Sequence, residues 1–111
     1  MRNEVIVSAV VFRSASANGR WVAQCIEHDI CVSAATLDEL SIRLQRQLVS
    51  EIANNHRKGR VGLDGIEPAP LRFREMFEAS HTELTHINGL VQNQHSIPAK
   101  VVPALRVYEA A

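Results

Sequence analysis

Apolar and polar residues alternate along the first third of the chain in the way typical of β-strands. Residues 5–12 carry apolar side chains on both strand faces, which indicates a strand that is buried on both sides or lies in a dimer sheet. A serine-rich stretch that ends at Asn18 and Gly19 favours a tight turn. The alternation resumes over residues 21–26 and 30–34, and the short links between the three strands predict an antiparallel meander.

Helical spacing replaces this alternation from Thr36 onward. Thr36 and Glu39 have the spacing of a capping box, and Gly59 suits the left-handed residue that ends a helix, so we expect a helix over residues 36–56. One apolar stripe of this helix consists of Leu37, Leu40, Leu44, Leu48 and Ile52. A second, adjoining stripe consists of Ile42, Val49 and Ala53. Together the stripes make an apolar arc about twice as wide as a one-sided surface helix needs.

The width of this arc allows two interpretations. Either the helix is packed between the sheet and a second segment of the same chain, or it also forms part of an interface between copies of the protein. The candidate residues for an oligomer or partner interface are Ile42, Val49, Ile52 and Trp21. Twelve basic and twelve acidic residues give zero net charge and little repulsion between copies, so we expect a homo-oligomer, a dimer or larger.

The second half of the chain gives weaker signals. A connection rich in glycine and proline covers residues 60–70, and Pro70 favours a helix that starts at Leu71. Helical spacing relates Phe73, Met76, Phe77, Leu84, Ile87 and Val91. Because residues 80–83 repeat the spacing of a capping box and Gly89 is a helix breaker, one long helix and two short helices remain alternatives.

The end of the chain predicts a closing strand over residues 104–108, after a polar stretch with two prolines at residues 93–103. The expected fold is therefore α+β: an antiparallel sheet of three to four strands packed by one long helix, with a short C-terminal helix and the closing strand. We expect a single domain over residues 1–111, with a core at about residues 4–57 and a helical and extended C-terminal part at about residues 60–111.

Composition narrows the function classes. A net charge of zero argues against a general nucleic-acid binder and against a polybasic membrane-surface protein, because both depend on excess positive charge. No apolar segment approaches the roughly 20 residues that a membrane span requires. Glu4 and Arg13 flank the apolar run at residues 5–12 and argue against a signal peptide. With two cysteines, too few for a disulfide scaffold, we expect a protein of the cytoplasm.

Two cysteines and a histidine form the first candidate site. Cys25, His28 and Cys31 are zinc-type ligands at three-residue steps with Asp29 beside them, so a small metal- or ligand-binding domain is one alternative. A structural zinc site needs four ligands and no second cysteine pair exists, so buried thiols, without a metal or other cofactor, are the preferred interpretation. No nucleophile signature or phosphate-binding loop is present, so we do not expect an enzyme.

A basic cluster forms the second candidate site and consists of His56, Arg57, Lys58 and Arg60. Cations are favoured at the C-terminal end of a helix, which explains the cluster without a ligand. A weak RNA-binding domain is the alternative interpretation, although no aromatic residue within the cluster offers a base a stacking surface.

An aromatic-Val-Ala segment, a Cys-Val pair and a Thr-Leu-x-Glu helix start follow one another in the first half of the chain. They are Trp21-Val22-Ala23, Cys31-Val32, and Thr36-Leu37 with Glu39. This order resembles the HicB-like antitoxin family over about residues 5–52. Residues 26–30 lack the proline and glycine of that family's loop, and Ala34-Ala35 replace its Gly-Asp before the helix.

The resemblance implies a three-stranded meander, a packed helix and further closure of the sheet, similar to the double-stranded-RNA-binding-domain topology. In that family the domain caps a small RNA-cleaving toxin, and a C-terminal helix-turn-helix or ribbon-helix-helix module binds operator DNA. Residues 60–111 show the pattern of neither module. The resemblance therefore implies a non-enzymatic protein-interaction module that could bind a small toxin-like protein, without DNA as a partner, and the balanced charge predicts no membrane partner.

Overall fold

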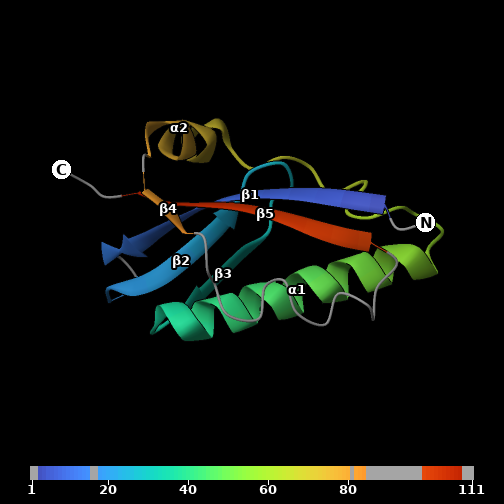
Figure 1. The fold of residues 1–111 in the computed structure, drawn as a ribbon, viewed down its shortest axis with the longest axis horizontal. Coiled ribbons are helices and arrows are strands. Elements are labelled where there is room, and N and C mark those ends of the chain that lie inside the picture. Colours follow the sequence, from blue (N-terminus) through green and yellow to red (C-terminus); the bar gives the residue numbers. More distant parts are fainter. Residues whose placement is uncertain (1–2, 16–17, 81, 85–98, 109–111) are drawn as a thin grey trace.

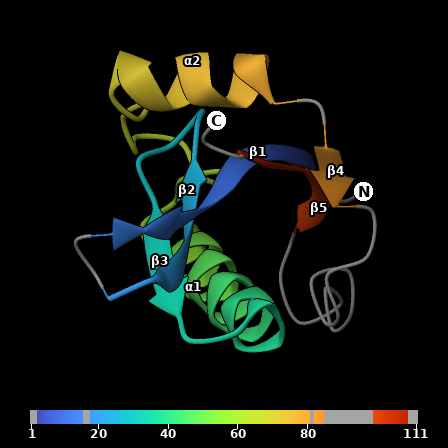
Figure 2. The ribbon, with the colours of Figure 1, turned by 90° about the vertical axis from the view of Figure 1, so that its left-hand side faces the viewer.

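A computed structural model describes residues 3–15, 18–80, 82–84 and 99–108. Within these residues, a five-stranded sheet has the order β3-β2-β1-β5-β4, with one helix on each face (Figures 1 and 2). The strands are β1 (Asn3–Ser14), β2 (Arg20–Cys25), β3 (Cys31–Ala34), β4 (Thr82–Leu84) and β5 (Ala99–Val107). The helices are α1 (Leu37–Arg57) and α2 (Leu71–Ala79). The predicted α+β class is confirmed.

The first three strands form the predicted antiparallel meander. β1 pairs with β2, and β2 pairs with β3, both antiparallel. The link between β1 and β2 includes Asn18 and Gly19, which have positive φ values of 55° and 74°. Glycine has no Cβ to clash there, and asparagine tolerates the left-handed region better than most residues. The local Asn-Gly signal therefore places the turn correctly.

The closing strand runs parallel to β1, so the sheet is mixed and the prediction of an antiparallel sheet is wrong at this place. A parallel neighbour needs a long crossover, and the chain between β1 and β5 supplies one through both helices. β5 also begins at Ala99, earlier than predicted, and includes Pro103 opposite Val7. A proline is tolerated here because, in the described chain, β4 covers only the last residues of β5 and leaves the rest as an edge.

Residues 82–84 form a strand where both alternatives predicted a helix. The Ser80 hydroxyl donates to the Met76 carbonyl at 2.7 Å, and the Ser80 backbone is extended, so Ser80 ends α2 instead of capping a new helix. β4 then pairs antiparallel with β5. Long-range pairing has therefore overridden a local capping signal. Ile87, Gly89 and Val91 lie outside the described residues.

Helix α1 covers one face of the sheet. Thr36 caps its start, since the Glu39 backbone N–H donates to the Thr36 hydroxyl at 3.1 Å, and Gly59 follows its end with φ 77°. The buried residues on its inner face are Leu40, Ser41, Leu44, Leu48, Ile52 and Asn55. Ile52 is 0% exposed, which corrects its placement among the interface candidates: it belongs to the core. No helix in the described part of the chain has the length and apolarity to cross a membrane.

Helix α2 lies on the opposite face and is held by fewer contacts. Its Phe73 ring stacks on Phe12 of β1 with centroids 6.2 Å apart. The Arg106 guanidinium lies 4.4 Å from the Phe77 ring centre and donates to the Phe77 carbonyl at 3.2 Å. No residue of α2 is fully buried. This layer is therefore thinner than the α1 layer.

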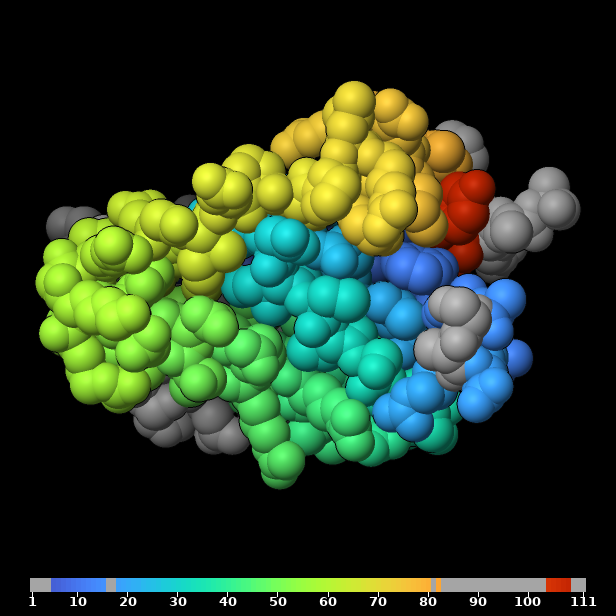
Figure 3. Space-filling model, turned by 180° about the vertical axis from the view of Figure 1, so that it is seen from behind, coloured from blue at the N-terminus to red at the C-terminus, as the bar shows by residue number. Residues whose placement is uncertain are grey.

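The segment between the two helices wraps around the edge of the sheet. Figure 3 shows it running along the surface from the end of α1 (green) to α2 (yellow). The Asp29 backbone N–H donates to the Glu67 carbonyl at 2.6 Å, and the Ala69 N–H donates to the Ile26 carbonyl at 3.0 Å. These bonds fasten the segment to the loop between β2 and β3.

Candidate functional site

A hollow of about 300 Å³ lies between the first half of β1 and the turn that follows α1. Ile6 and Val61 line it and are 59% and 51% exposed, which is unusual for two large apolar side chains at one place. Its remaining lining residues are Val5, Gly62 and Leu63, with Glu27, His28 and Asp64 as polar members. The hollow therefore combines apolar lining residues with polar and charged ones.

The strand β1 places Ile6 at this hollow. Side chains alternate along a strand, so the buried Val5 and Val7 face α1 and Ile6 faces the opposite side. β2 pairs with β1 only from Ala9 onward, so in the described chain β5 is the only strand that pairs with residues 3–7 of β1. Ile6 therefore lies on an unpaired stretch of strand edge.

The turn that carries Val61 is held from inside the protein. The buried Asn55 side chain donates to the Gly62 and Asp64 carbonyls, both at 3.0 Å. Gly62 has φ 56°, and a Cβ at this position would lie 3.0 Å from the Val5 side chain. A larger residue is thus disfavoured both by backbone conformation and by space. The hollow is bordered by a fixed turn.

The polar lining residues, called the rim here, carry two carboxylates and one imidazole. Glu27 accepts a hydrogen bond from the Ser8 backbone N–H at 2.8 Å, and Asp64 is exposed. His28 Nδ1 lies 2.9 Å from the Ile66 carbonyl oxygen, and because a carbonyl only accepts, Nδ1 is the donor in this bond. The carboxylates make the rim acidic, so the hollow suits an apolar group that has a cation next to it.

The interface residues predicted from the sequence do not all reach the surface. Ile42 on α1 is 43% exposed. Val49 and Trp21 are partly buried and pack against the core, and the Arg13 guanidinium lies 4.9 Å from the Trp21 ring centre. Since Ile52 is enclosed, Ile42 is the most accessible of the four candidates.

The cysteines and the histidine are not brought together as ligands. Cys25 lies in the core, where burial, with the nearby Glu27 charge, raises the pKa of its thiol to about 12. Cys31 is exposed, and burial of part of its side chain together with Asp29 raises the pKa of its thiol. Asp29 accepts from the Gln24 amide at 2.9 Å. Among the described residues, no three His, Cys, Asp or Glu side chains are grouped so that they could hold a metal ion.

The basic cluster stays at the surface around the end of α1. His56, Arg57, Lys58 and Arg60 are all exposed. The Lys58 N–H donates to carbonyls of the last helical turn, where the negative end of the helix dipole favours cations. This position agrees with a helix-end role, and RNA binding by the cluster stays a prediction.

Sequence reasoning missed the hollow because its residues come from three separate stretches, at 5–6, 27–28 and 61–64. One signal for it was present: residues 5–12 are apolar on both strand faces, and the face that α1 does not cover needs another contact. Val61 and Leu63 are a second signal, because they are apolar residues within a connection rich in glycine.

The fold and the hollow define a small α+β domain with an exposed apolar site and an acidic rim. No protein-family model, no curated protein and no solved structure matches the chain.

Proposed function

We propose that this protein is a non-enzymatic protein-interaction module, similar to HicB-type antitoxins, that binds a small basic protein at the hollow. The observation that carries the proposal is the pair Ile6 and Val61, two exposed apolar side chains that line the same hollow. Protein interfaces combine apolar groups with polar and charged ones. The carboxylates of Glu27 and Asp64 on the rim favour a partner with positive charge around an apolar side chain.

The order of elements supports the HicB-like part of the proposal. A meander, a long helix and a strand that closes the sheet beside β1 follow one another as the resemblance implies. Trp21 lies in β2, Thr36 caps α1, and Glu39 lies in its first turn. A reducing compartment such as the cytoplasm suits a chain with two cysteines, which are too few for a disulfide scaffold.

Binding to any small basic protein that is encoded beside the gene tests the proposal. Both proteins are purified and titrated by calorimetry, with Ile6→Asp and Val61→Asp as variants. We expect each variant to weaken binding about tenfold or more, because a carboxylate would be buried against an apolar partner group. Leu71→Asp is the matched control, since Leu71 is 66% exposed on α2 and outside the hollow. Equal binding by all three variants, or no binding by the wild type, contradicts the proposal.

We also propose that the protein forms a homo-oligomer through the outer flank of α1. Ile42 is exposed there, and Val49 lies seven positions further along the helix and so on nearly the same side. A second copy that presents the same flank would bury both side chains. Light scattering after size-exclusion chromatography tests this: Ile42→Arg should give a monomer and Leu71→Arg should not. A wild-type monomer at micromolar concentration would exclude the oligomer.

A further inference from the structure

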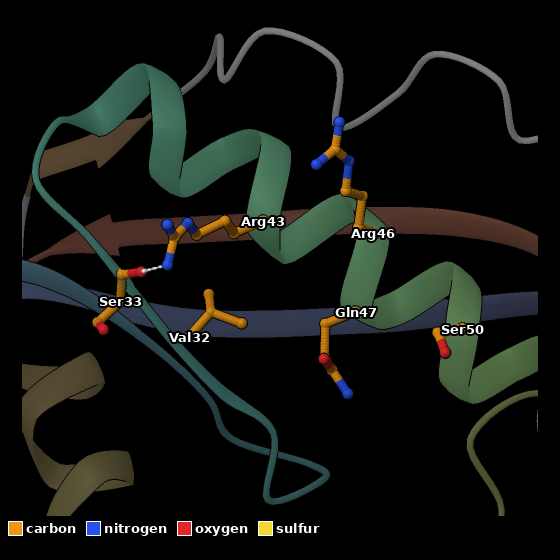
Figure 4. Close-up of a pocket in the computed structure, with 6 residues that line it drawn as sticks. All are labelled: Val32, Ser33, Arg43, Arg46, Gln47 and Ser50. Carbon is orange, nitrogen blue, oxygen red and sulfur yellow. Dashed lines mark hydrogen bonds between the residues drawn. The ribbon is translucent and has the colours of Figure 1, made fainter.

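A second groove runs between the edge strand β3 and helix α1. Its volume is about 590 Å³, and its lining residues are Val32, Ser33, Arg43, Arg46, Gln47 and Ser50 (Figure 4). In Figure 4, Arg43 reaches from α1 toward the Ser33 carbonyl, while Arg46 extends from α1 in another direction. This groove shares no lining residue with the hollow described above, and none of its lining residues carries a carboxylate. The groove is therefore a separate and basic surface.

The edge of β3 directs backbone groups toward this groove. The Cys25 N–H donates to the Ile30 carbonyl at 2.8 Å, and in an antiparallel pair this fixes which residues bond to the neighbour. The direction alternates along the strand. Val32 and Ala34 therefore bond toward β2 as Ile30 does, whereas Cys31 and Ser33 direct their backbone groups outward. The 3.2 Å bond from the Arg43 guanidinium to the Ser33 carbonyl agrees with this direction.

The described chain leaves most of this edge open. Cys31 and Ser33 direct their backbone N–H and carbonyl groups outward. Among these groups, the Ser33 carbonyl has a partner in the described chain, the Arg43 side chain. An arginine over a strand edge also protects it from unspecific pairing. Arg43 is itself held by Glu39, with 2.8 Å between Nη2 and Oε1, and both side chains are exposed. Exposed ion pairs contribute little, so an incoming carboxylate can replace this contact.

We propose that β3 and this groove bind an extended acidic segment of a partner protein by strand addition. The backbone of the segment would pair with Cys31 and Ser33, and alternate side chains would enter the groove. Carboxylates at these positions would meet Arg43, and Arg46, which also lines the groove, adds positive charge, which explains why the segment is acidic. A second copy of the chain is a poorer occupant, because pairing β3 with its own copy would bring two arginine sets together.

A short blocked peptide that alternates glutamate and threonine tests this proposal by fluorescence anisotropy at low salt. We expect Arg46→Glu to weaken binding about fivefold or more, and Arg57→Glu, an exposed arginine of the same helix outside the groove, to change it less than about twofold. A peptide with lysine in place of glutamate should bind at least about tenfold more weakly. Ile6→Asp should leave peptide binding unchanged, which separates this proposal from the proposed function.

Backbone methylation of the peptide distinguishes strand addition from simple charge attraction. Two forms of the peptide carry methyl groups on alternate amide nitrogens, one form on each edge of the extended peptide. Methylation removes the donors that pair with a strand, so we expect about a tenfold loss of affinity for the form whose methylated edge faces β3. Equal affinity of both methylated forms and the parent peptide overturns strand addition. Tighter binding of an oligouridine than of the acidic peptide, with the same sensitivity to Arg46→Glu, would replace the protein partner by RNA. No binding up to about 1 mM also overturns the proposal.

Discussion

The Glu27 carboxylate accepts a hydrogen bond from the Ser8 backbone N–H at 2.8 Å, next to the point where the pairing of β1 with β2 ends. The Ser8 carbonyl accepts from the Ile26 N–H, also at 2.8 Å. A side chain therefore takes the place of a strand carbonyl at the end of the ladder. Glu27 also lines the hollow, so the carboxylate that bonds to the end of the β1–β2 ladder also belongs to the proposed binding site.

Removing the Glu27 carboxylate should destabilise the fold. Glu27→Ala leaves the Ser8 N–H, which is partly buried, without its acceptor, and we expect a loss of about 1–3 kcal/mol in the free energy of unfolding. Glu27→Gln keeps an acceptor oxygen but loses the charge, so about half of that loss is expected. Urea unfolding measures both, with Glu78→Ala on the exposed side of α2 as a control. Identical urea midpoints for Glu27→Ala and the wild type would contradict this role.

Asn55 should be essential for the turn beside the hollow. Its amide donates to the Gly62 and Asp64 carbonyls, and Asn55→Asp replaces this double donor by a buried carboxylate that faces two acceptors. We expect a loss of about 3–5 kcal/mol at neutral pH, which becomes smaller in acid because a protonated carboxyl can donate one bond. Asn54→Asp is the control, one position away and only half-buried. A loss that is equal for both variants would show that the two bonds are unimportant.

The two thiols should differ in reactivity. Cys31 is exposed and Cys25 is buried in the core. A thiol-specific colorimetric reagent should titrate one thiol in the folded protein and both in strong denaturant. Cys31 should react more slowly than an unperturbed thiol, because burial of part of its side chain and the Asp29 charge raise its pKa and lower the thiolate fraction. Cys31→Ser should remove the reaction of the folded protein, and a remaining reactive thiol would place Cys25 at the surface.

Local signals predicted the parts of the fold that single short segments determine. Thr36 and Gly59 mark the ends of α1, and Asn18 with Gly19 forms the first turn, because each acts through its own backbone or the next few residues. The direction of β5 depends on pairing with a strand about 95 residues away, and no local pattern encodes that. The hollow has the same difficulty. Its lining residues, at 5–6, 27–28 and 61–64, come together only when the strand, the loop and the turn are assembled.

Stability should fall in alkaline solution through Cys25. Burial is the main reason that its pKa is raised from 9.0 to about 12, so the folded state holds this proton more tightly than the unfolded state. The contribution of the Cys25 thiol to the free energy of unfolding is therefore complete below pH 9. It is lost as the pH rises toward 12, by about 1.4 kcal/mol per pH unit. Cys25→Ala should lower stability near neutral pH and flatten this decline. Urea unfolding at about pH 8 and about pH 10.5 measures the difference, and equal slopes for both proteins would contradict it.

The two helical layers should contribute unequally to stability. Leu44 of α1 is 1% exposed, and Leu44→Ala should cost about 2–5 kcal/mol through lost burial and the cavity that remains. Phe73 of α2 is only partly buried and stacks on Phe12, so Phe73→Ala should cost less and should release α2 before the sheet unfolds. Hydrogen exchange should then show early loss of protection in residues 71–79, with β1 and α1 still protected.

Leu71→Ala, at an exposed position of the same helix, should change stability by less than about 0.5 kcal/mol. If Phe73→Ala costs as much as Leu44→Ala and all elements exchange together, α2 belongs to the same cooperative core as α1.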